Sequence, residues 1–383
     1  MIRVLEVFGR LNRGGAEMRT LDVLREIDRN QFSIDMVALT DQPGDLDEDF
    51  RQLGCRVIHC PLDSMLPWRF PRLVVGYDVV HVHLQFFSGY ILRLARWAGV
   101  PRRIIHFRGT TRGNERRWRY PLQTRIMQHL IQRDATRIVG NGESSLALAW
   151  NREWRRDPRC LVIPNGLDHR PLDIVPDPEG VRKEFGFPSQ APLVVHVGRM
   201  DLAKNHLRLA EICRTIYQMH SETRFLFIGR EDPDIGNRLR SRLEALGMTE
   251  VVRLTGTRQD VGRLIHAADL LLFPSLHEGV PGAVLEAGAI GLPVLASDLP
   301  GVQEIARHLR DIHQMPLSSP DTAWANTAWN ILVRHRQKDR VTNAKEALRR
   351  FARTIFALPN CIKAHEILWK GGGRSDIDLL YQQ

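Results

Sequence analysis

The chain has 383 residues, of which 43% are hydrophobic and 26% are charged, and its formal net charge is +10. At roughly 100–200 residues per domain, this length predicts two domains with cores of ordinary size. No apolar run approaches the ~18 residues of a membrane-spanning helix, and the first residues pass directly into strand-like sequence, so we expect neither a membrane span nor a signal peptide.

The cysteines are scattered along the chain and form neither a Cys-x-x-Cys pair nor a cluster with histidine. They are Cys55, Cys60, Cys160, Cys213 and Cys361. Their odd number and irregular spacing favour reduced thiols in the core of a cytoplasmic protein, and no structural zinc site is indicated.

The positive charge is concentrated in one part of the chain. Residues 1–50 hold six arginines against eleven acidic residues, whereas residues 101–150 hold ten arginines, no lysine and three acidic residues. Such a local arginine field indicates an anionic partner, which could be a phospholipid surface, a phosphate-bearing acceptor or nucleic acid. The arginines lack the interleaved aromatic residues of a base-stacking platform, so we expect no nucleic acid among the partners.

The first predicted strand is Arg3–Phe8, and a loop leads from it to Gly14 and Gly15, just before a helix that begins near Ala16. Two glycines at this point let the backbone approach a ligand closely at the positive end of a helix. The alternative is a tight strand-to-helix turn that binds nothing. The spacing differs from the Gly-x-Gly-x-x-Gly of dinucleotide-binding proteins.

Short apolar runs predict further strands in the first half of the chain. They lie at residues 33–39, 56–60, 78–83, 103–107, 137–141 and 161–163, with helical segments such as 90–97 and 118–133 between them. Because strands alternate with helices, the pattern predicts a doubly wound parallel sheet.

Polar residues stand at the ends of the fourth and fifth strands, the edge where a parallel sheet binds its ligands. The fourth strand ends in His81–His83, and the fifth ends in His106–Gly109. The His-x-His spacing also suits zinc, but no cysteine or carboxylate stands at ligand spacing, so we expect no metal site here.

A change of composition marks the boundary between the predicted domains. Five prolines fall within residues 171–192, which disfavours long regular elements and suits a connector. We therefore expect a first domain at residues 1–170, a connector at residues 171–191 and a second domain at residues 192–354.

The second domain opens with the buried strand Leu193–Val197, which ends at Gly198 and Arg199, and a turn then leads to Lys204. The two cations therefore lie at one strand-to-helix junction. There the arginine could grip a diphosphate in bidentate fashion and the lysine could act as a point charge. The alternative is that both are solvated surface charges.

Two more strands are predicted at residues 224–229 and 251–256, and the loop after the first of them begins at Gly229 and Arg230. Both loops lie at the ligand edge of the predicted second sheet.

Residues 270–297 are predicted to form a strand, a loop, a helix and a second strand, and the loop faces the ligand edge of the sheet. Glu278 lies in this loop, and Glu286 lies one to two turns into the helix. Between them, the amides of residues 279–284 point out of a helix N-terminus, which attracts phosphate. This arrangement suits a sugar nucleotide, with one carboxylate for the sugar and one for the ribose. Alternatively, Glu278 caps the turn and Glu286 is a solvated helix residue.

Four phrases of the sequence resemble signatures of the family 4 retaining glycosyltransferases of GT-B fold. They are Gly14-Gly15-Ala16-Glu17, I-P-N-G-L-D at residues 163–168, V-G-R-x-x-x-x-K-N at residues 197–205, and S-L-H-E-G-x-P-x-x-x-L-E-A-x-A-x-G-x-P-V at residues 275–294. The resemblance runs nearly from end to end and is weakest at residues 40–75 and after Gly371.

The resemblance implies an α/β fold of two facing Rossmann-like domains, with the active site in the cleft between them. A C-terminal helix, about residues 355–383, is expected to pack back on the first domain. The implied activity is hexosyl transfer, with retention of anomeric configuration, from a UDP- or GDP-linked donor. The implied acceptor is a glycan or a lipid-linked glycan, used in cell-surface polysaccharide or glycoconjugate biosynthesis. The nucleotide sugar is a substrate, and neither a cofactor nor a metal is expected.

The resemblance also assigns roles to particular residues. The expected catalytic residues are Arg199, Lys204, Glu278 and His106. The expected acceptor-side residues are Arg108 and Asn165. The expected donor-binding residues are Gly14, Gly15, Gly198, Arg199, Lys204, Gly229, Arg230, Glu278, Gly279, Val280, Pro281, Gly282, Val284, Leu285 and Glu286.

In the family, a histidine at the end of the fifth strand approaches the transferred sugar, and this chain allows two registers for that position. Alternation along a strand places His106 and Arg108 on the same side, so periodicity does not choose between them. We expect His106 to be the residue on the sugar side, with Arg108 contributing positive charge.

The arginine-rich segment Arg102–Arg137 is expected to dock on the anionic inner face of a membrane that presents a lipid-linked acceptor. Its densest part is Arg116, Arg117 and Arg119, with Trp118 and Tyr120 as interfacial anchors. The alternative is a solvated, salt-bridged helix. For the whole chain, the alternative functions are a nucleotide-sugar epimerase of the same fold or a basic nucleic-acid-binding protein.

Overall fold

The computed structural model describes residues 1–109 and 120–382. It divides into two compact units: unit 1 consists of residues 1–166 together with 355–383, and unit 2 consists of residues 167–354. The chain therefore leaves unit 1, completes unit 2 and then returns to unit 1. The predicted connector lies within unit 2 and includes a helix, α7 (Pro178–Glu184).

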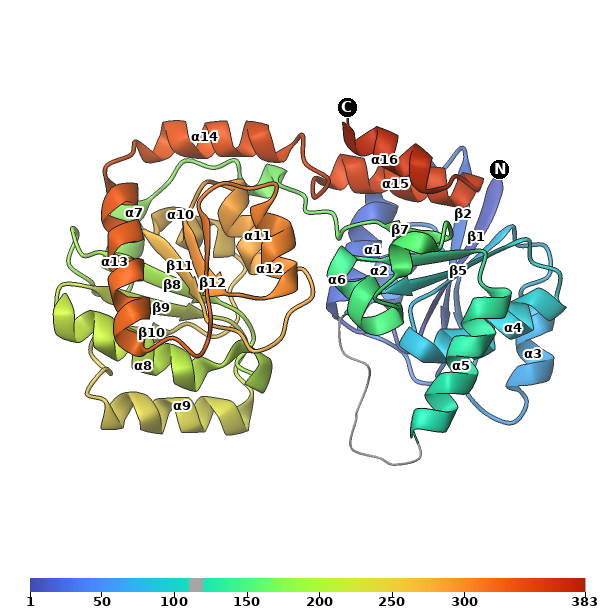
Figure 1. Cartoon of the computed structure of the whole chain (residues 1–383), viewed down its shortest axis with the longest axis horizontal. Coiled ribbons are helices and arrows are strands. Elements are labelled where there is room, and N and C mark those ends of the chain that lie inside the picture. The colour runs from blue at the N-terminus through green and yellow to red at the C-terminus, as the bar shows by residue number, and fades with distance from the viewer. Residues whose placement is uncertain (110–119, 383) are drawn as a thin grey trace. The chain divides into compact units, whose positions relative to one another are not determined.

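Unit 1 contains a parallel sheet with helices on both faces (Figure 1). In the described part of the unit, seven strands follow the order β3-β2-β1-β4-β5-β6-β7. The strands are β1 (Ile2–Phe8), β2 (Phe32–Ala38), β3 (Val57–His59), β4 (Val79–Val82), β5 (Arg102–Phe107), β6 (Arg137–Gly140) and β7 (Cys160–Val162). The order reverses beside β1, where β4 pairs in the register Val4 with Val79.

The helices of unit 1 come from both ends of the chain. They are α1 (Gly15–Glu26), α2 (Asp47–Gln52), α3 (Leu66–Leu73), α4 (Ser88–Trp97), α5 (Tyr120–Asp134), α6 (Glu143–Ser145), α15 (Leu358–Lys370) and α16 (Arg374–Gln382), with short turns η1 (Gln85–Phe87), η2 (Leu146–Trp150) and η3 (Trp154–Arg156). Helix α15 contacts α1, α16 and β1, so the last helices of the chain are part of this unit.

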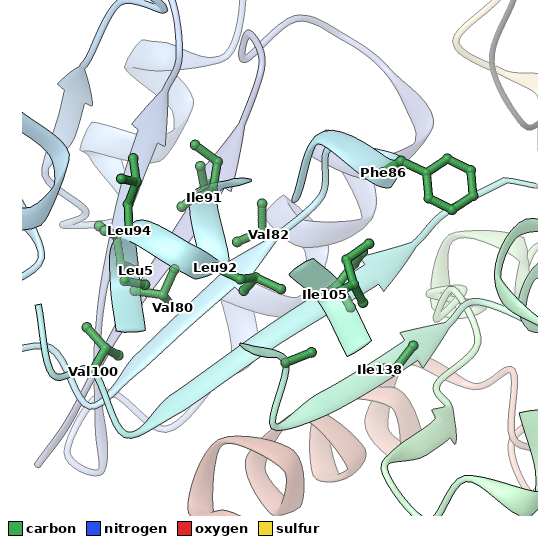
Figure 2. Close-up of a cluster of buried hydrophobic side chains, with 14 of the residues drawn as sticks. Leu5, Val80, Val82, Phe86, Ile91, Leu92, Leu94, Val100, Ile105 and Ile138 are labelled. Carbon is green, nitrogen blue, oxygen red and sulfur yellow. The ribbon is translucent and has the colours of Figure 1, made fainter. Parts of the chain in front are cut away.

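Helices cover both faces of this sheet, which explains why its central strands read as nearly continuous apolar runs. Along β1, Leu5 and Val7 point to the face covered by α3, α4 and α5, and this cluster is drawn in Figure 2. Val4 and Phe8 point to the other face, which α1 and α15 cover. Glu6 lies between them and is 1% exposed, so the strand places one carboxylate inside the core.

Unit 2 contains a second parallel sheet (Figure 1), and its six described strands follow the order β10-β9-β8-β11-β12-β13. The strands are β8 (Leu193–Val197), β9 (Arg224–Ile228), β10 (Val252–Leu254), β11 (Leu270–Phe273), β12 (Val294–Ser297) and β13 (Ile312–Met315). The remaining helices and turns are η4 (Arg170–Leu172), η5 (Leu202–Lys204), α8 (His206–Met219), α9 (Pro233–Ala245), α10 (Val261–Ala267), α11 (Gly282–Ala289), α12 (Pro300–Ala306), α13 (Asp321–Arg336) and α14 (Arg340–Phe351).

The predicted fold class, two doubly wound α/β domains, is confirmed. All five cysteines are buried and unbridged, as the sequence indicated. Among the described helices, none is both long and apolar enough to cross a membrane.

Candidate functional site

The loop between β8 and α8 carries the two cations that the sequence singled out. Asp201 accepts hydrogen bonds from the Lys204 amide at 3.2 Å and from Nε of Arg199 at 3.0 Å. Asn205 then takes a left-handed conformation, with φ 56°, directly before α8, a conformation that asparagine tolerates better than most residues. The turn is thus fixed by its own side chains, and the Arg199 side chain remains 59% exposed.

Lys204 forms an ion pair with Glu278, the first of the two predicted carboxylates. Its Nζ donates to Oε1 of Glu278 at 2.6 Å, and the two side chains are only 19% and 12% exposed. The same Nζ lies 4.8 Å from the ring centroid of Phe273, within range of a cation–π interaction. The structure therefore brings together two predicted residues that lie 74 positions apart in the sequence.

Hydrogen bonds join the loops that carry this ion pair. The Leu276 amide donates to the Ala203 carbonyl at 2.8 Å. The side-chain amide of Asn205 donates to the Pro274 carbonyl at 3.1 Å. The loops after β8 and β11 are consequently held as one surface at the carboxyl ends of neighbouring strands, which is where open α/β sheets bind ligands.

Close backbone contacts explain two glycines of unit 2, of which Gly229 was predicted to bind the donor. A Cβ on Gly229, whose φ is +149°, would lie 2.0 Å from the Gly198 carbonyl oxygen. A Cβ on Gly301 would lie 1.4 Å from the Gly279 carbonyl oxygen. These glycines are therefore required by packing at the ligand edge. The neighbouring Arg230 is exposed, and its carbonyl accepts from the Met200 amide at 2.9 Å.

Helix α11 begins directly after the Glu278 loop, with Pro281 as its N-cap residue. The side chains of Val280, Val284 and Leu285 are at most 8% exposed, so they can meet a ligand mainly through their backbone. The Leu285 amide already donates to the Pro281 carbonyl at 3.2 Å. The first-turn amides, at residues 282–284, are thus the ones that the helix start presents.

Glu286 lies in α11 and is half-buried, whereas Glu278 lies in the loop before it. The two carboxylates therefore come from the same strand-to-helix connection, in the order that the sequence predicted.

In unit 1, Gly14 is the N-cap residue of α1 and Gly15 is its first residue. A Cβ on Gly14 would lie 2.4 Å from a carboxylate oxygen of Glu17, whereas a Cβ on Gly15 would meet nothing within 4 Å. Burial raises the pKa of Glu17, and this rise is opposed by its own backbone amide and by the charge of Arg108. The start of α1 and the end of β5 therefore belong to one polar region.

Arg108 and Asn165, the two predicted acceptor-side residues, are in direct contact. Nη1 of Arg108 donates to Oδ1 of Asn165 at 2.9 Å, and Nη2 donates to Oγ1 of Thr20 at 3.4 Å. Its Nε donates to Nδ1 of His83 at 3.3 Å. Arg108 stands just past β5, and the residue as a whole is partly exposed.

His106 has no exposed surface. Its Nδ1 lies 3.3 Å from Nε2 of His81, and its ring also lies beside that of His365. Burial, followed by the charge of Arg108, lowers the pKa of His106 well below its ordinary value, so the ring is neutral. Of the two side chains, Arg108 is the one that is partly exposed, and the sugar-side role of His106 stays a prediction.

Among the described residues, one group of three has the geometry to hold a metal ion: ring nitrogens of His81, His83 and His106 lie within 4.8 Å of one another. However, Glu6 already contacts Nδ1 of His81 at 2.9 Å and Nε2 of His83 at 2.5 Å. The guanidinium of Arg108 bonds to the remaining nitrogen of His83 and would repel a cation. These contacts favour a hydrogen-bonded network over a metal site.

Sequence reasoning missed several members of this network. Glu6 could have been noticed as a carboxylate in the otherwise apolar run at residues 4–8. His365 and Trp369, on α15, carry no such signal, because only the fold brings that helix onto the sheet. Nε1 of Trp369 lies 3.4 Å from Nδ1 of His81, and His365 bonds to the Cys361 carbonyl at 2.8 Å.

The arginines of the predicted membrane-docking segment divide into several groups. Arg103 donates to the carbonyl of Asp134 at 2.8 Å and Arg137 to that of Gly372 at 3.0 Å, so both support the fold. Arg125 and Arg133 are exposed on α5. Arg112, Arg116, Arg117, Trp118 and Arg119 lie outside the described residues, as does the side chain of Tyr120.

Comparison with known families confirms the class. Residues 191–332 match the family of glycosyl transferases group 1, and residues 14–166 match the glycosyl transferase 4-like domain. The fold and these matches define the chain as a glycosyltransferase of GT-B fold. More particularly, it belongs to the glycosyl transferases of group 1. A transferase family does not favour the epimerase or the nucleic-acid-binding alternative.

Individual relatives support the same assignment. The chain is 26% identical over 341 residues to the capsular polysaccharide biosynthesis glycosyltransferase CapH of Staphylococcus aureus, covering 87% of this chain and 92% of CapH. It is 28% identical over 231 residues to the UDP-Gal:alpha-D-GlcNAc-diphosphoundecaprenol alpha-1,3-galactosyltransferase of Escherichia coli, covering 59% of each. Its fold is similar to the crystal structure of Anabaena HepE in complex with UDP, with a TM-score of 0.80 and 19% identity over 97% of this chain and 100% of HepE.

Proposed function

We propose that the chain transfers a sugar from a UDP-linked donor to a lipid-linked glycan, with retention of anomeric configuration, in the synthesis of a cell-surface polysaccharide. The observation that carries the donor site is the Lys204–Glu278 ion pair, which lies beside the exposed Arg199 at the carboxyl ends of β8 and β11. Cations for a diphosphate and a carboxylate for sugar hydroxyls thus stand at one edge of the sheet.

In this proposal, Arg199 and Lys204 bind the diphosphate of the donor and stabilise the negative charge that grows as it departs. Lys204 then exchanges part of its bond to Glu278 for a phosphate oxygen. Glu278, released from that bond, accepts hydrogen bonds from the hydroxyls of the transferred sugar. Once the donor is bound, these groups are in place, so little further reorganisation accompanies the chemical step.

Glu286 is proposed to bind the ribose diol, and the first-turn amides of α11 a phosphate. The cations and amides together supply the charge stabilisation that a metal ion would otherwise give, so the proposal includes no metal and no cofactor. Retention is part of the proposal because it is the chemistry that the four sequence phrases imply. It is tested by the anomeric configuration of the product, read by NMR.

The choice of UDP is supported by the HepE structure, whose ligand is UDP. Titration calorimetry with UDP, GDP and ADP tests this choice, and UDP should bind more tightly than the other two. Transfer is then assayed from UDP-glucose and UDP-galactose to a diphosphoundecaprenol-linked GlcNAc. A chain that binds none of the three nucleotides and transfers neither sugar would contradict the proposed function.

A lipid-linked acceptor is supported by the Escherichia coli relative, which acts on a diphosphoundecaprenol-linked sugar. The structure adds an exposed face of α5 on which Leu122 and Ile126 are 69% and 49% exposed, beside the exposed Arg125 and Arg133. Exposed apolar residues among arginines are typical of a helix that lies in a membrane interface. We therefore propose that this face docks on an anionic membrane.

Co-sedimentation with vesicles tests the docking. Binding should rise with the content of anionic lipid, fall with added salt and weaken in a variant that carries Leu122→Ser, Arg125→Ser and Arg133→Ser. A matched control on α9 of unit 2, Arg238→Ser with Arg240→Ser, should bind like the parent. Equal recovery in the supernatant with anionic and neutral vesicles at low salt would rule out docking.

A further inference from the structure

The carboxylate of Glu6, the imidazole of His83 and the guanidinium of Arg108 form a linear chain of hydrogen bonds. Oε2 of Glu6 lies 2.5 Å from Nε2 of His83, and Nε of Arg108 lies 3.3 Å from Nδ1 of the same ring. A guanidinium can only donate, so Nδ1 of His83 must carry a lone pair. Its Nε2 therefore carries the proton and donates to Glu6.

Glu6 and His83 are buried deeply enough for the hydrogen bonds between these groups to be strong. Glu6 is 1% exposed, and the His83 side chain has no exposed surface. Burial lowers the pKa of His83 to about 3, so the ring is neutral at physiological pH. Burial alone would raise the pKa of Glu6, but the neighbouring His81 and His83 outweigh it and hold that pKa below its usual value. A neutral imidazole thus bridges a buried carboxylate and a guanidinium.

We propose that Glu6 and His83 are positioning residues that hold the guanidinium of Arg108 at the end of β5, an inference that rests on the proposed function and on the predicted acceptor-side role of Arg108. Glu6 sets the tautomer of His83, and that tautomer in turn presents a lone pair to Arg108. Asn165 and Thr20 bond to the other two guanidinium nitrogens, so the group is held on several sides.

His81 offers a matched control for the role of His83. His81 is also buried and also contacts Glu6, through Nδ1 at 2.9 Å, but Arg108 bonds to His83 instead. Both rings can be replaced by phenylalanine with stacking retained. His83 stacks on Phe8 with centroids 4.3 Å apart, and His81 stacks on His106 at 5.3 Å. Each variant removes one partner of Glu6, and only His83→Phe also removes a partner of Arg108.

The test measures how fast phenylglyoxal modifies Arg108, read by mass spectrometry of the peptide that contains it. A hydrogen bond to a charged group is worth enough that its loss should raise the modification rate about tenfold in His83→Phe. The rate in His81→Phe should stay within about twofold of the parent. The thermal midpoint of each variant shows that it is folded. Because the readout needs neither donor nor acceptor, it can fail while the proposed function stands, and the reverse also holds.

A second variant, Glu6→Gln, keeps the shape of the hydrogen-bonded chain but removes the negative charge of Glu6. In Glu6→Gln the side-chain carbonyl can still accept from His83, but without the charge, so the Arg108 rate should rise above that of the parent and by less than in His83→Phe. This variant decides the question if His83→Phe does not fold. Equal rates in His83→Phe and His81→Phe, or an Arg108 rate unchanged by both His83→Phe and Glu6→Gln, would overturn the positioning role.

Discussion

At the scale of single residues, the two cations of the donor site differ in what surrounds them. Arg199 is exposed and bonds to a neighbour in its own turn, whereas Lys204 reaches across to another loop and is largely buried with its partner. An exposed pair contributes little to stability, and a buried carboxylate that loses its partner costs far more. Arg199 and Lys204 are therefore proposed to share a role in binding the diphosphate, but they differ in how much they contribute to the stability of the fold.

Substituting each cation should separate these roles. Arg199→Ala should lower kcat/KM by about tenfold or more, since a charge-assisted hydrogen bond is worth ~1.5–3 kcal/mol, while changing the free energy of unfolding by less than about 1 kcal/mol. Lys204→Ala should lower kcat/KM and also destabilise the fold by ~1–3 kcal/mol, because Glu278 then stays buried without this partner. Transfer kinetics and urea denaturation measure the two effects. Wild-type kcat/KM in either variant would contradict the assignment.

The two carboxylates should be separable by ligand. Glu286→Gln should weaken binding of both UDP and the complete UDP-sugar, because both ligands contain the ribose. Glu278→Gln should mainly weaken binding of the UDP-sugar. Titration calorimetry measures all four affinities, and equal losses for both ligands in both variants would remove the distinction.

The sequence predicted where the candidate residues of unit 2 lie better than how they contact one another. The apolar strands and the glycine-rich loops were enough to place Arg199, Lys204 and Glu278 at one edge of a sheet. Their spacing could not show that Lys204 bonds to Glu278 and Arg199 to Asp201, because those contacts depend on how the loops meet. In unit 1, the alternation of side chains along β5 could not decide between His106 and Arg108, because both side chains point to the same side of the sheet. The two differ in that His106 lies within the strand and Arg108 lies just past its end.

At the scale of elements, helices α15 and α16 complete the hydrophobic core of unit 1. Trp369 is 1% exposed and packs edge-on against Phe32 of β2. Arg374 fastens the start of α16 by donating to the carbonyls of Cys160 at 2.9 Å and Arg155 at 2.7 Å. The sequence suggested that this segment packs on the first domain, but an amphipathic helix alone does not identify the sheet that it covers.

Replacing the buried Trp369 of α15 by alanine should therefore destabilise the fold. Trp369→Ala should lower the free energy of unfolding by ~3–5 kcal/mol, because it leaves a cavity in the core and removes the ring contacts of Trp369 with His81 and His365. Trp68→Ala is the control, since Trp68 is 65% exposed on α3 and its loss should cost less than about 0.5 kcal/mol. Urea denaturation compares the two, and similar losses would show that α15 is not part of the core.

At the scale of the whole molecule, both units bury neutral histidines, which makes the fold sensitive to acid. Burial lowers the pKa of His206 and of His335 in unit 2 to about 4 and that of His365 in unit 1 to about 3. In the unfolded chain each titrates near its ordinary value of about 6.5. Below that pH the unfolded state binds protons that the folded state excludes, so stability falls as the pH falls.

The free energy of unfolding should therefore drop steadily between about pH 6.5 and pH 4.5, by up to ~1.4 kcal/mol per pH unit for each such histidine. His206→Leu should reduce the slope, and it removes two ring nitrogens that have no hydrogen-bond partner among the described residues. His129→Asn, at an exposed position of α5, should leave the slope unchanged. Urea denaturation at several pH values measures it, and an unchanged slope in His206→Leu would contradict a role for this histidine in the acid sensitivity.

The path of the chain through the two units sets an order for folding during synthesis. Unit 2 is one continuous segment, residues 167–354, whereas unit 1 needs residues from both ends. When the ribosome has released unit 2, the sheet of unit 1 still lacks Leu358 and Trp369 from its core. Domains generally fold as units while they emerge. One face of the first sheet therefore stays uncovered until the last two helices have been synthesised.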